Sequence, residues 1–421
     1  MPKQRTTIEL PRGTLDLTYQ TNSHNGNAAY QLNDLLGFAQ RINPKRAFLF
    51  VSKVLGRHIP VAPSTMRTAF TDLATLIPSH LPEPILVIGM AETAVGLSAG
   101  VHQALQTRYP NVLLLNSTRH AQHSADAASN DSARLLTTFS EDHSHASQHL
   151  IYQSAEQATQ AQLLASKTLI MVDDEASTGN TCVNVVTALR HAGLSQLAQV
   201  HLTTLVDWSL NQQQETTDTA DAISSRLPDI DFYRHHLLSG AWTWTDAPNP
   251  EPIMMPAVDT TEAGSQPLGD TGNWGRFPTL DSTKGFDHYL AHFQTVFTRF
   301  REQISPSQPQ WPARILVLGS NEFVWLPFLL AEWLESQTQT VVNSAATVKF
   351  GALTRSPIAL GGAIGTMLSF RDHYGLGMTN FVYNVEPKAW DLIVLCVETA
   401  ADSVDEMWQD LDNVLIVGGK I

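Results

Sequence analysis

Short apolar runs alternate with longer segments of mixed polarity along much of the chain. The runs of strand length are AFLFVS (47–52), ILVIGM (85–90), VLLLNS (112–117), HLIY (149–152), TLIMVDD (168–174) and VHLTTLVDW (200–208). The segments between most of them are long enough for helices. This alternation predicts an α/β fold with a mainly parallel sheet that is covered by helices.

The pattern changes between Asp246 and Gly285, where proline, glycine and small polar residues prevail. Such a composition is typical of a linker or a surface excursion. Strand-length runs then resume as RILVLG, VKFGAL, FVYNV, LIVLCV and VLIVGG. A chain of 421 residues is also long for one typical core. We therefore predict a first α/β domain over 1–245, a linker over 246–285 and a second α/β domain over 286–421.

Composition narrows the classes of protein. The chain has 26 Lys and Arg against 40 Asp and Glu, a net charge of −14, which argues against a general nucleic-acid or membrane-surface protein. Cys182 and Cys396 are its two cysteines, too few for a disulfide framework. The opening MPKQRTTIEL lacks the apolar stretch of a secretory signal, and no run approaches the roughly 20 apolar residues of a membrane span. We expect a soluble cytoplasmic protein.

The stretch VDDEASTGNT places Asp173 and Asp174 at the end of an apolar strand. Adjacent carboxylates repel each other and resist burial, so a cation or hydrogen-bond donors should share their site. The carboxyl edge of a parallel sheet is where ligands bind in such folds. The small residues that follow supply backbone N–H groups at the predicted start of a helix, a place that favours a phosphate. Together these features point to a ribose 5-phosphate.

This stretch resembles the phosphoribosyl pyrophosphate (PRPP) signature of type I phosphoribosyltransferases, which have a Rossmann-like fold. The resemblance implies that Asp173 and Asp174 hold the ribose 2′- and 3′-hydroxyls. It also implies a PRPP-binding segment that comprises Glu175, Ala176, Ser177, Thr178, Gly179, Asn180 and Thr181, in which the residues from Ala176 onward hold the 5′-phosphate. Glu175 departs from common versions of the motif, where an apolar or small residue is frequent. The alternative is an acidic helix cap, as found in many nucleotide folds.

Other segments agree with this resemblance. The loop after ILVIG occupies the place of the family's pyrophosphate loop, and its residues Gly89, Met90, Ala91, Glu92 and Thr93 would offer backbone donors to the leaving group. Upstream, Lys53 and Arg57 are basic side chains suited to phosphates. Mg²⁺ would arrive with PRPP, without direct protein ligands.

A long polar segment lies between Arg119 and the run HLIY, and loops of this length inside a domain are often lids. In type I phosphoribosyltransferases a mobile loop at this place closes over PRPP. The resemblance therefore makes Arg119, Glu141, His143 and His145 candidate catalytic residues beside Asp173 and Asp174. A transition-metal site built from His120, His123, His143, His145 and His149 is an alternative, although their spacing matches no closed zinc pattern.

The chain also resembles a narrower group, the phosphoribosyltransferases encoded with bacterial tellurite-resistance and stress operons. Their C-terminal TRSP domain is named for a Thr-Arg-Ser-Pro motif, which stands here at Thr354 to Pro357. The resemblance runs from about Asn43 to the end of the chain. It implies a PRPP-dependent pentosyltransferase that makes a ribosylated, nucleotide-like metabolite and releases pyrophosphate. A PRPP-binding regulator without turnover, or an enzyme that splits a nucleotide or nucleoside in the reverse direction, stays open.

The two halves of the chain also resemble each other. ILVIGMAE (85–92) aligns with ILVLGSNE (315–322), Thr118-Arg119 with Thr354-Arg355, and LIMVDDE (169–175) with LIVLCVE (392–398). We hypothesise that the TRSP domain is a diverged copy of the first domain, in which Cys396 and Val397 replace the two aspartates. Its strand edge should then form a second site with Glu322, Thr354, Arg355 and Ser356. A structural turn at Pro357, with Arg355 in an ion pair, is equally compatible with the motif.

The expected ligands are PRPP and a small-molecule acceptor, with no nucleic acid and no membrane partner. A homodimer or a complex with enzymes encoded in the same operon is left open.

Overall fold

The chain folds into two units, with a mainly parallel sheet in unit 1 and a parallel sheet in unit 2. The structure is a computed structural model that describes residues 3–22, 30–41, 46–122, 135–140, 148–209, 223–250, 252–253, 274–304, 311–339 and 346–418. Unit 1 comprises Met1–Leu35, Thr68–Glu251 and Trp274–Ser282, and unit 2 comprises Leu36–Arg67, Pro252–Asn273 and Thr283–Ile421. The division of the chain at 245 and 286 stays a prediction, to which the structure adds that the segment 36–67 lies in unit 2.

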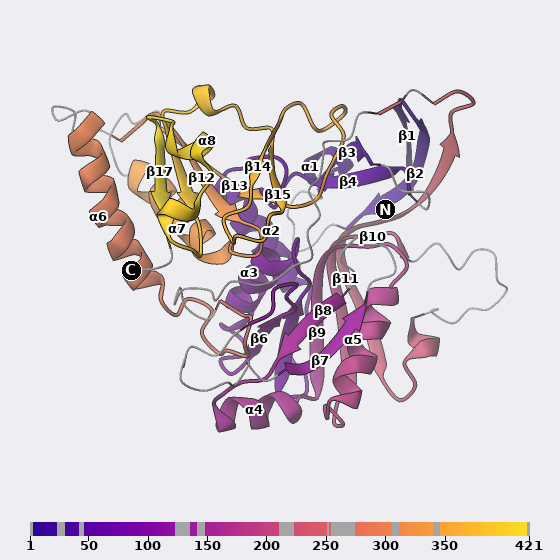
Figure 1. Cartoon of the computed structure of the whole chain (residues 1–421). Helices are drawn as coiled ribbons and strands as arrows, with labels where there is room; N and C mark the ends of the chain where they lie inside the picture. Colours follow the sequence, from indigo (N-terminus) through magenta and orange to yellow (C-terminus); the bar gives the residue numbers. More distant parts are fainter. Residues whose placement is uncertain are drawn as a thin grey trace. The chain divides into compact units, whose positions relative to one another are not determined.

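Unit 1 contains a seven-stranded sheet (Figure 1). Its order is β1 (Gln4–Leu10), β2 (Gly13–Thr21), β11 (Asp231–Asp246), β10 (Gln199–Asp207), β9 (Thr168–Ala176), β5 (Ile85–Gly89) and β6 (Leu113–Asn116). The five strands from β11 to β6 are parallel, whereas β1 and β2 are antiparallel to their neighbours. The predicted mainly parallel α/β fold is confirmed.

Helices and a hairpin complete unit 1. The helices are α2 (Pro63–Thr75), of which unit 1 contains the part from Thr68, α3 (Val95–Leu105), α4 (Gln157–Leu164), α5 (Asn180–His191) and the short turn η2 (Ser224–Arg226). Helix α3 packs on β5, β6 and β9, and its small and apolar residues are almost all buried. The run HLIY forms β8 (Gln148–Tyr152), which pairs with β7 (Leu135–Ser140) in a separate hairpin and not in the main sheet.

Unit 2 contains a four-stranded parallel sheet. Its order is β13 (Thr347–Leu353), β12 (Arg314–Ser320), β16 (Leu392–Cys396) and β17 (Val414–Val417). The helices are α6 (Phe286–Ile304), α7 (Trp325–Gln339) and α8 (Glu406–Gln409), with short turns η3 (Pro387–Ala389) and η4 (Ala401–Ser403), and α7 packs on β12 and β13. Two hairpins belong to this unit. One pairs β14 (Met367–Arg371) with β15 (Thr379–Tyr383), and the other pairs β3 (Leu36–Gln40) with β4 (Phe48–Ser52). The short helix α1 (Leu32–Leu35), at the end of the first segment of unit 1, directly precedes β3.

The run AFLFVS is thus a strand, but it pairs in a hairpin of unit 2. Val51 on β4 belongs to a buried cluster with Ala39, Ile358, Phe381 and Tyr383. Burial of apolar surface stabilises a protein by about 25 cal/mol per Å². This gain explains why the hairpin packs in unit 2, although the chain that follows it from Thr68 belongs to unit 1.

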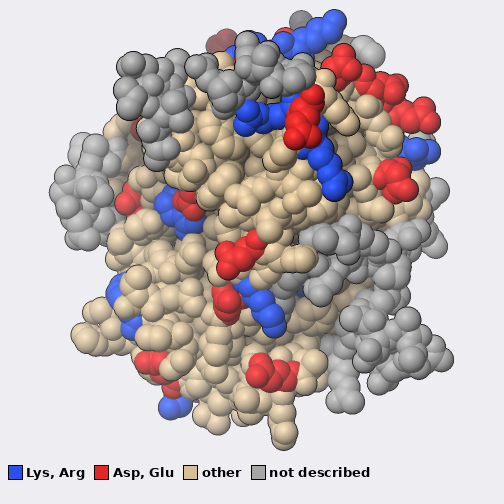
Figure 2. Space-filling model, turned by 90° about the vertical axis from the view of Figure 1, so that its left-hand side faces the viewer, with Lys and Arg blue, Asp and Glu red and all other residues tan. Residues whose placement is uncertain are grey.

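No helix among the described residues is long and apolar enough to cross a membrane. On the face shown in Figure 2, basic and acidic side chains lie interspersed among other residues. The described part of that face therefore carries no continuous basic stripe.

The parallel sheets of the two units share one topology. In chain order the strands β5, β6, β9 and β10 form the spatial order β6-β5-β9-β10, and β12, β13, β16 and β17 form the order β13-β12-β16-β17. A helix follows the first strand in each case, and a two-stranded hairpin stands between the second and the third.

Backbone contacts at equivalent positions agree as well. Thr118 exchanges two backbone hydrogen bonds with Leu150 (3.0 and 2.8 Å), and Thr354 does the same with Phe381 (2.9 and 2.7 Å). Four residues after each threonine, a backbone N–H donates to a tyrosine hydroxyl, at 2.9 Å to Tyr152 and at 2.8 Å to Tyr383. These shared contacts support the hypothesis that unit 2 contains a diverged copy of the unit 1 core.

The sheet registers correct one part of the sequence alignment. Leu86 lies opposite Leu169, whereas its counterpart Leu316 lies opposite Ile393. Leu169 therefore corresponds to Ile393 and not to Leu392, and both side chains face an apolar cluster of their unit. The prediction that Cys396 and Val397 replace the two aspartates is wrong by one residue, because two apolar runs can be aligned by letter while their alternating faces disagree. Val397 and Glu398 take these positions.

Candidate active site of unit 1

The loops after β5 and β9 meet at the carboxyl edge of the unit 1 sheet. The chain leaves β5 to form β6 on one side, while β9 lies on the other, so the edge between β5 and β9 is a topological switch point. Ligands of open α/β sheets bind in such places. Thr93 Oγ1 donates a hydrogen bond of 3.0 Å to Asp174 Oδ1, which joins the two predicted loops.

The two aspartates extend from the last part of β9 and are partly exposed. The backbone N–H of Asp174 donates to Asp173 Oδ1 at 2.9 Å. Burial, and then the charge of Glu175, raise the pKa of the Asp174 carboxyl, and the hydrogen bonds from Thr93 and the backbone oppose this rise. The ionised form of Asp174 is therefore disfavoured, and hydroxyl donors or a cation would stabilise it.

The segment after the aspartates turns into helix α5 at Gly179. This residue has φ 74°, in the left-handed region, and a Cβ there would collide with the side chain of Ile223. Thr178 Oγ1 accepts from the Asn180 N–H at 3.3 Å. The turn leaves backbone N–H groups at the start of a twelve-residue helix, whose dipole favours an anion.

Arg226 stands beside this helix start, and the sequence reasoning missed it. Its Nη1 donates to Asn180 Oδ1 at 2.6 Å, and the side chain is exposed. It comes from η2, 46 positions further along the chain. No local motif marks it, because only the fold brings it to the predicted phosphate loop. It supplies a cation where an anion would bind.

The loop from Gly89 to Thr93 is fixed by hydrogen bonds to its neighbours. The Met90 N–H donates to the Val172 carbonyl oxygen at 3.4 Å, and the Ala91 N–H donates to Ser117 Oγ at 3.0 Å. The peptide bond between Ala91 and Glu92 is cis. A Cβ on Gly89 would collide with the side chains of Ser98 and Asn116, so the strand end is too crowded for any other residue.

His149 connects this loop to Arg119. Its Nδ1 lies 2.9 Å from Ser117 Oγ and its Nε2 lies 3.4 Å from Arg119 Nη2. A guanidinium can only donate, so Nε2 accepts and the proton sits on Nδ1, which donates to Ser117. The ring is fully buried and stacks on Phe139 at 4.7 Å. Sequence reasoning considered His149 only as a metal ligand, whereas here it orients Ser117 and Arg119.

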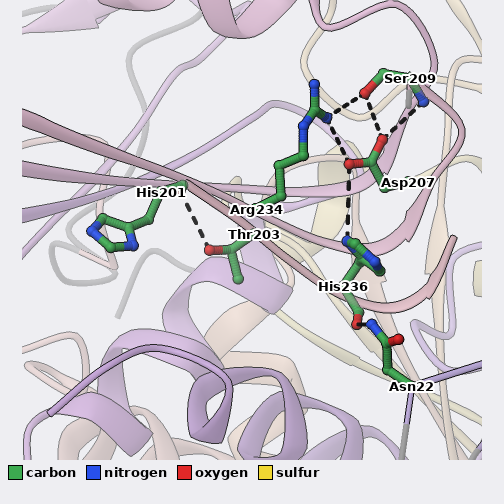
Figure 3. A network of polar contacts seen from close by, with 7 residues as sticks. All are labelled: Asn22, His201, Thr203, Asp207, Ser209, Arg234 and His236. Carbon is green, nitrogen blue, oxygen red and sulfur yellow. Dashed lines mark hydrogen bonds and ion pairs between the residues drawn. The ribbon is translucent and has the colours of Figure 1, made fainter. Parts of the chain in front are cut away.

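A second buried network holds the end of β10 (Figure 3). Arg234 Nη1 lies 2.7 Å from Asp207 Oδ2, and Ser209 donates to Asp207 Oδ1 from its N–H (2.8 Å) and its Oγ (2.5 Å). His236 Nδ1 is 3.9 Å from the same carboxylate. The next N–H, that of Trp208, donates to the carbonyl oxygen of Ala176 at 2.7 Å. The ion pair thus fixes the end of β10, and the Trp208 bond ties this end to the start of the predicted phosphate loop at Ala176.

The remaining predicted residues lie elsewhere. Lys53 and Arg57 belong to unit 2, where Arg57 is buried and donates to the carbonyl oxygen of Asn321. Their part in PRPP binding stays a prediction. Glu141, His143 and His145, with most of the predicted lid, lie outside the described residues. Within the described part of the chain, no three His, Cys, Asp or Glu side chains gather as a metal site. Glu322, Thr354, Arg355 and Ser356 all lie in unit 2.

Comparisons with known proteins bear on this geometry. Residues 35–234 match the family model described as phosphoribosyl transferase, and residues 275–414 match the TRSP domain, described as C-terminal to that transferase. The sequence has no significant match among curated proteins.

Similar solved structures are distant. They include the adenine phosphoribosyltransferase of Trypanosoma brucei in complex with AMP, pyrophosphate and ribose-5-phosphate, at 13% identity over 48% of this chain and 76% of that chain, with a TM-score of 0.30. The adenine phosphoribosyltransferase of Leishmania tarentolae has 10% identity over 49% and 85% and a TM-score of 0.29. A hypoxanthine phosphoribosyltransferase of Staphylococcus aureus has 11% identity over 44% and 77% and a TM-score of 0.23.

The two family models occur in the predicted order and together account for most of the described residues of both units. The chain belongs to the phosphoribosyl transferases that carry a C-terminal TRSP domain.

Proposed function

We propose that this protein transfers the 5-phosphoribosyl group of PRPP to a small-molecule acceptor and releases pyrophosphate. The observation that carries the proposal is the hydrogen bond of 3.0 Å between Thr93 and Asp174. It joins the loop proposed for pyrophosphate to the carboxylates proposed for ribose, at the edge where α/β sheets bind ligands.

In this reaction the bond between C1 of ribose and the pyrophosphate oxygen breaks, and its electron pair leaves with pyrophosphate. A lone pair of the acceptor forms the new bond to C1. Positive charge develops on the sugar ring, as in glycosyl transfer generally. Asp173 and Asp174 would accept hydrogen bonds from the ribose 2′- and 3′-hydroxyls and stabilise that charge. The N–H groups from Ala176 to Thr181, with Arg226 nearby, would hold the 5′-phosphate.

The residues at this edge fit Mg²⁺ that enters with PRPP. Three consecutive carboxylates, Asp173, Asp174 and Glu175, lie at the end of β9, and burial together with the charge of Glu175 raises the pKa of Asp174. Oxygen donors are the ligands that Mg²⁺ prefers, usually with several waters and substrate phosphates. When bound, the ion would neutralise charge on the departing pyrophosphate.

Arg119 would contact the pyrophosphate, and His149 would position it. The contacts from Arg119 through His149 and Ser117 to the Ala91 N–H form one chain. His149 is therefore a positioning residue in this proposal. The catalytic parts of Glu141, His143 and His145 stay predictions.

Cys182 and Cys396 are both buried and form no disulfide, which suits a reducing compartment and supports a cytoplasmic location. The role in tellurite resistance or stress and the partner enzymes stay predictions.

Calorimetry with Mg-PRPP tests the assignment. An Asp173→Asn, Asp174→Asn double variant keeps the shape of both side chains, and we expect its affinity to fall tenfold or more, because a hydrogen bond to a charged group contributes about 1.5–3 kcal/mol. Asp231→Asn is the matched control, since Asp231 is exposed at the amino end of β11, away from the carboxyl edge. Unchanged affinity in the double variant would remove the assignment.

Turnover needs a second assay. Incubation of the wild-type protein with Mg-PRPP and fractions of a metabolite extract should release pyrophosphate and give a product heavier by one phosphoribosyl group. Binding of PRPP without release in any fraction would favour the regulatory alternative.

A further inference from the structure

The carboxyl edge of the unit 2 sheet has the same switch point as that of unit 1. The chain leaves β12 to form β13 on one side, and β16 lies on the other. Asn321 and Glu322 follow β12, and Glu398 follows β16 after one residue. The register places Glu398 at the strand position of Asp174.

Two asparagines at this edge have unused hydrogen-bonding groups. Asn321 and Asn380 are fully buried, and the described residues offer no partner to the amide nitrogen or the amide oxygen of either side chain. Buried polar groups of native proteins almost always have partners, so each of these amides requires either a water or a bound molecule.

The two amides flank the end of β13. Asn321 stands in the left-handed region (φ 53°), and its backbone N–H donates to the Leu353 carbonyl oxygen at 3.1 Å. Asn380 precedes Phe381, which exchanges two hydrogen bonds with Thr354. Along β15 side chains alternate, so Asn380 faces the same side as Val382, which packs in a cluster with Leu353 and Val397. Asn380 therefore faces the ends of β13 and β16.

Two carboxylates and a guanidinium stand at the same edge. Glu322 and Glu398 are fully buried, and Tyr374 donates to Glu398 Oε2 at 2.7 Å. The turn that contains Tyr374 ends at Met378, whose sulfur lies 3.4 Å from Arg355 Nη1. The Asp372 carboxylate accepts the backbone N–H groups of Tyr374 (2.8 Å) and Met378 (2.8 Å) and so fixes this turn. Arg355 remains partly exposed.

We propose that this edge of unit 2 is a second ligand site, for a phosphorylated polyol of the pentose phosphate class. Hydroxyl groups would donate to Glu398 and to the amide oxygens of Asn321 and Asn380, whose NH₂ groups would donate to hydroxyl or ring oxygens. The Arg355 fork would bind one phosphate at the open end. The buried carboxylates repel a diphosphate, so PRPP itself does not fit. The comparison of Glu398 with Asp174 rests on the proposed function of unit 1, but the orphan amides do not.

The test is a titration of the full-length protein with ribose 5-phosphate in the presence of saturating Mg-PRPP, which occupies the first site. Ribose and inorganic phosphate serve as comparison probes and should each bind at least tenfold more weakly. Asn380→Leu and Arg355→Ala should each weaken ribose 5-phosphate at least tenfold, while the affinity for Mg-PRPP stays within twofold. Lys388→Ala, a change in the turn η3, is a control that should alter neither.

Three outcomes overturn the proposal. One is absence of ribose 5-phosphate binding to the wild-type protein. Another is binding that Asn380→Leu and Arg355→Ala leave unchanged, because the amides would then contact only water. The third is binding that Asp174→Asn abolishes, because the probe would then occupy unit 1. If Mg-PRPP itself fails to bind, the same titration in the Asp173→Asn, Asp174→Asn background still decides the second site. If Asn380→Leu does not fold, Arg355→Ala decides alone, because its side chain is partly exposed.

Discussion

The ion pair between Asp207 and Arg234 should be a main support of unit 1. Asp207 is 1% exposed and the Arg234 side chain 9% exposed, so Asp207→Asn leaves a buried guanidinium opposite an amide. The Ser209 bonds to Oδ1 can survive, but the Asn NH₂ would face the Arg234 donor at the 2.7 Å contact. Breaking a buried pair by removing one partner costs about 3–5 kcal/mol, a large share of the roughly 5–15 kcal/mol that stabilises a typical domain.

Urea unfolding followed by intrinsic fluorescence measures this loss. Because the chain has two units, the transition of unit 1 must be resolved before a free energy of unfolding is extracted. Asp231→Asn, an exposed change on the neighbouring strand, should stay within about 0.5 kcal/mol of the wild type. The double variant Asp207→Leu, Arg234→Met should lose less than the Asp207→Asn variant, since it leaves no buried charge unpaired.

Two results would refute the reasoning. One is a loss of less than about 1 kcal/mol for Asp207→Asn, which is the range of an exposed ion pair. The other is an Asp207→Leu, Arg234→Met double variant that loses as much as the Asp207→Leu and Arg234→Met single variants added together, because independent sites add and coupled ones do not. A weaker affinity for Mg-PRPP in folded Asp207→Asn protein would also be expected, since Trp208 on the same strand end donates to Ala176.

Three further predictions concern the edge of unit 1. Gly179→Ala should cost about 1–2 kcal/mol through its left-handed φ alone, and more through the collision with Ile223, and it should weaken Mg-PRPP binding in calorimetry. Gly193→Ala is the control, because Gly193 also has a positive φ (115°) but its Cβ would meet only Leu164 at ordinary contact distance, so the affinity for Mg-PRPP should not change. His149→Phe keeps the stack on Phe139 but loses both ring nitrogens, so the rate of pyrophosphate release should fall about tenfold. The His149→Gln variant should recover part of this rate. Equal rates for the His149→Phe variant and the wild type would contradict the positioning role. The pKa of the Asp174 carboxyl is raised in the folded protein, so the folded protein holds the carboxyl proton more tightly than the unfolded chain does. The stability of the protein therefore falls as the pH rises from about 4 through the folded pKa. Asp174→Asn should raise the thermal midpoint of the ligand-free protein at pH 7, by an amount that shrinks toward pH 4.

The strands could be predicted from the sequence more readily than their partners. The apolar runs 85–90 and 168–174 are predicted as strands and form β5 and β9. A short apolar run that is rich in β-branched residues favours a strand. The runs 47–52 and 149–152 are strands too, but they pair in hairpins outside the main sheets. Pairing depends on contacts between distant parts of the chain, which an apolar run does not encode.

The candidate site divides in the same way. The place of Asp173, Asp174 and Gly179 between a strand end and a helix start could be predicted, because these residues directly follow an apolar strand and precede a helical pattern. Their part in phosphate or ribose binding stays a prediction. Arg226, Asp207 and Arg234 stand far apart in the sequence and carry no motif, and only the sheet order brings them to the loop or to its support. The one-residue error in the alignment of β9 with β16 has the same origin, since burial on alternate faces decides the register and similarity of letters does not.

The difference between the two switch points bears on how each would work. In unit 1 the carboxylates are partly exposed and Asp174 is bonded by the short side chain of Thr93, so a ligand can enter and leave from solvent. In unit 2 the equivalent Glu398 is fully buried beneath Tyr374, whose turn is fixed by Asp372. A ligand that reaches Glu398 must displace or move that turn, and binding that requires a conformational change is slow in both directions. Under the proposed function, rapid exchange of PRPP and pyrophosphate therefore fits unit 1, and a more slowly exchanging ligand fits unit 2. Dissociation of ribose 5-phosphate from unit 2 should accordingly be slower than that of Mg-PRPP from unit 1, and a Tyr374→Ala change should speed it.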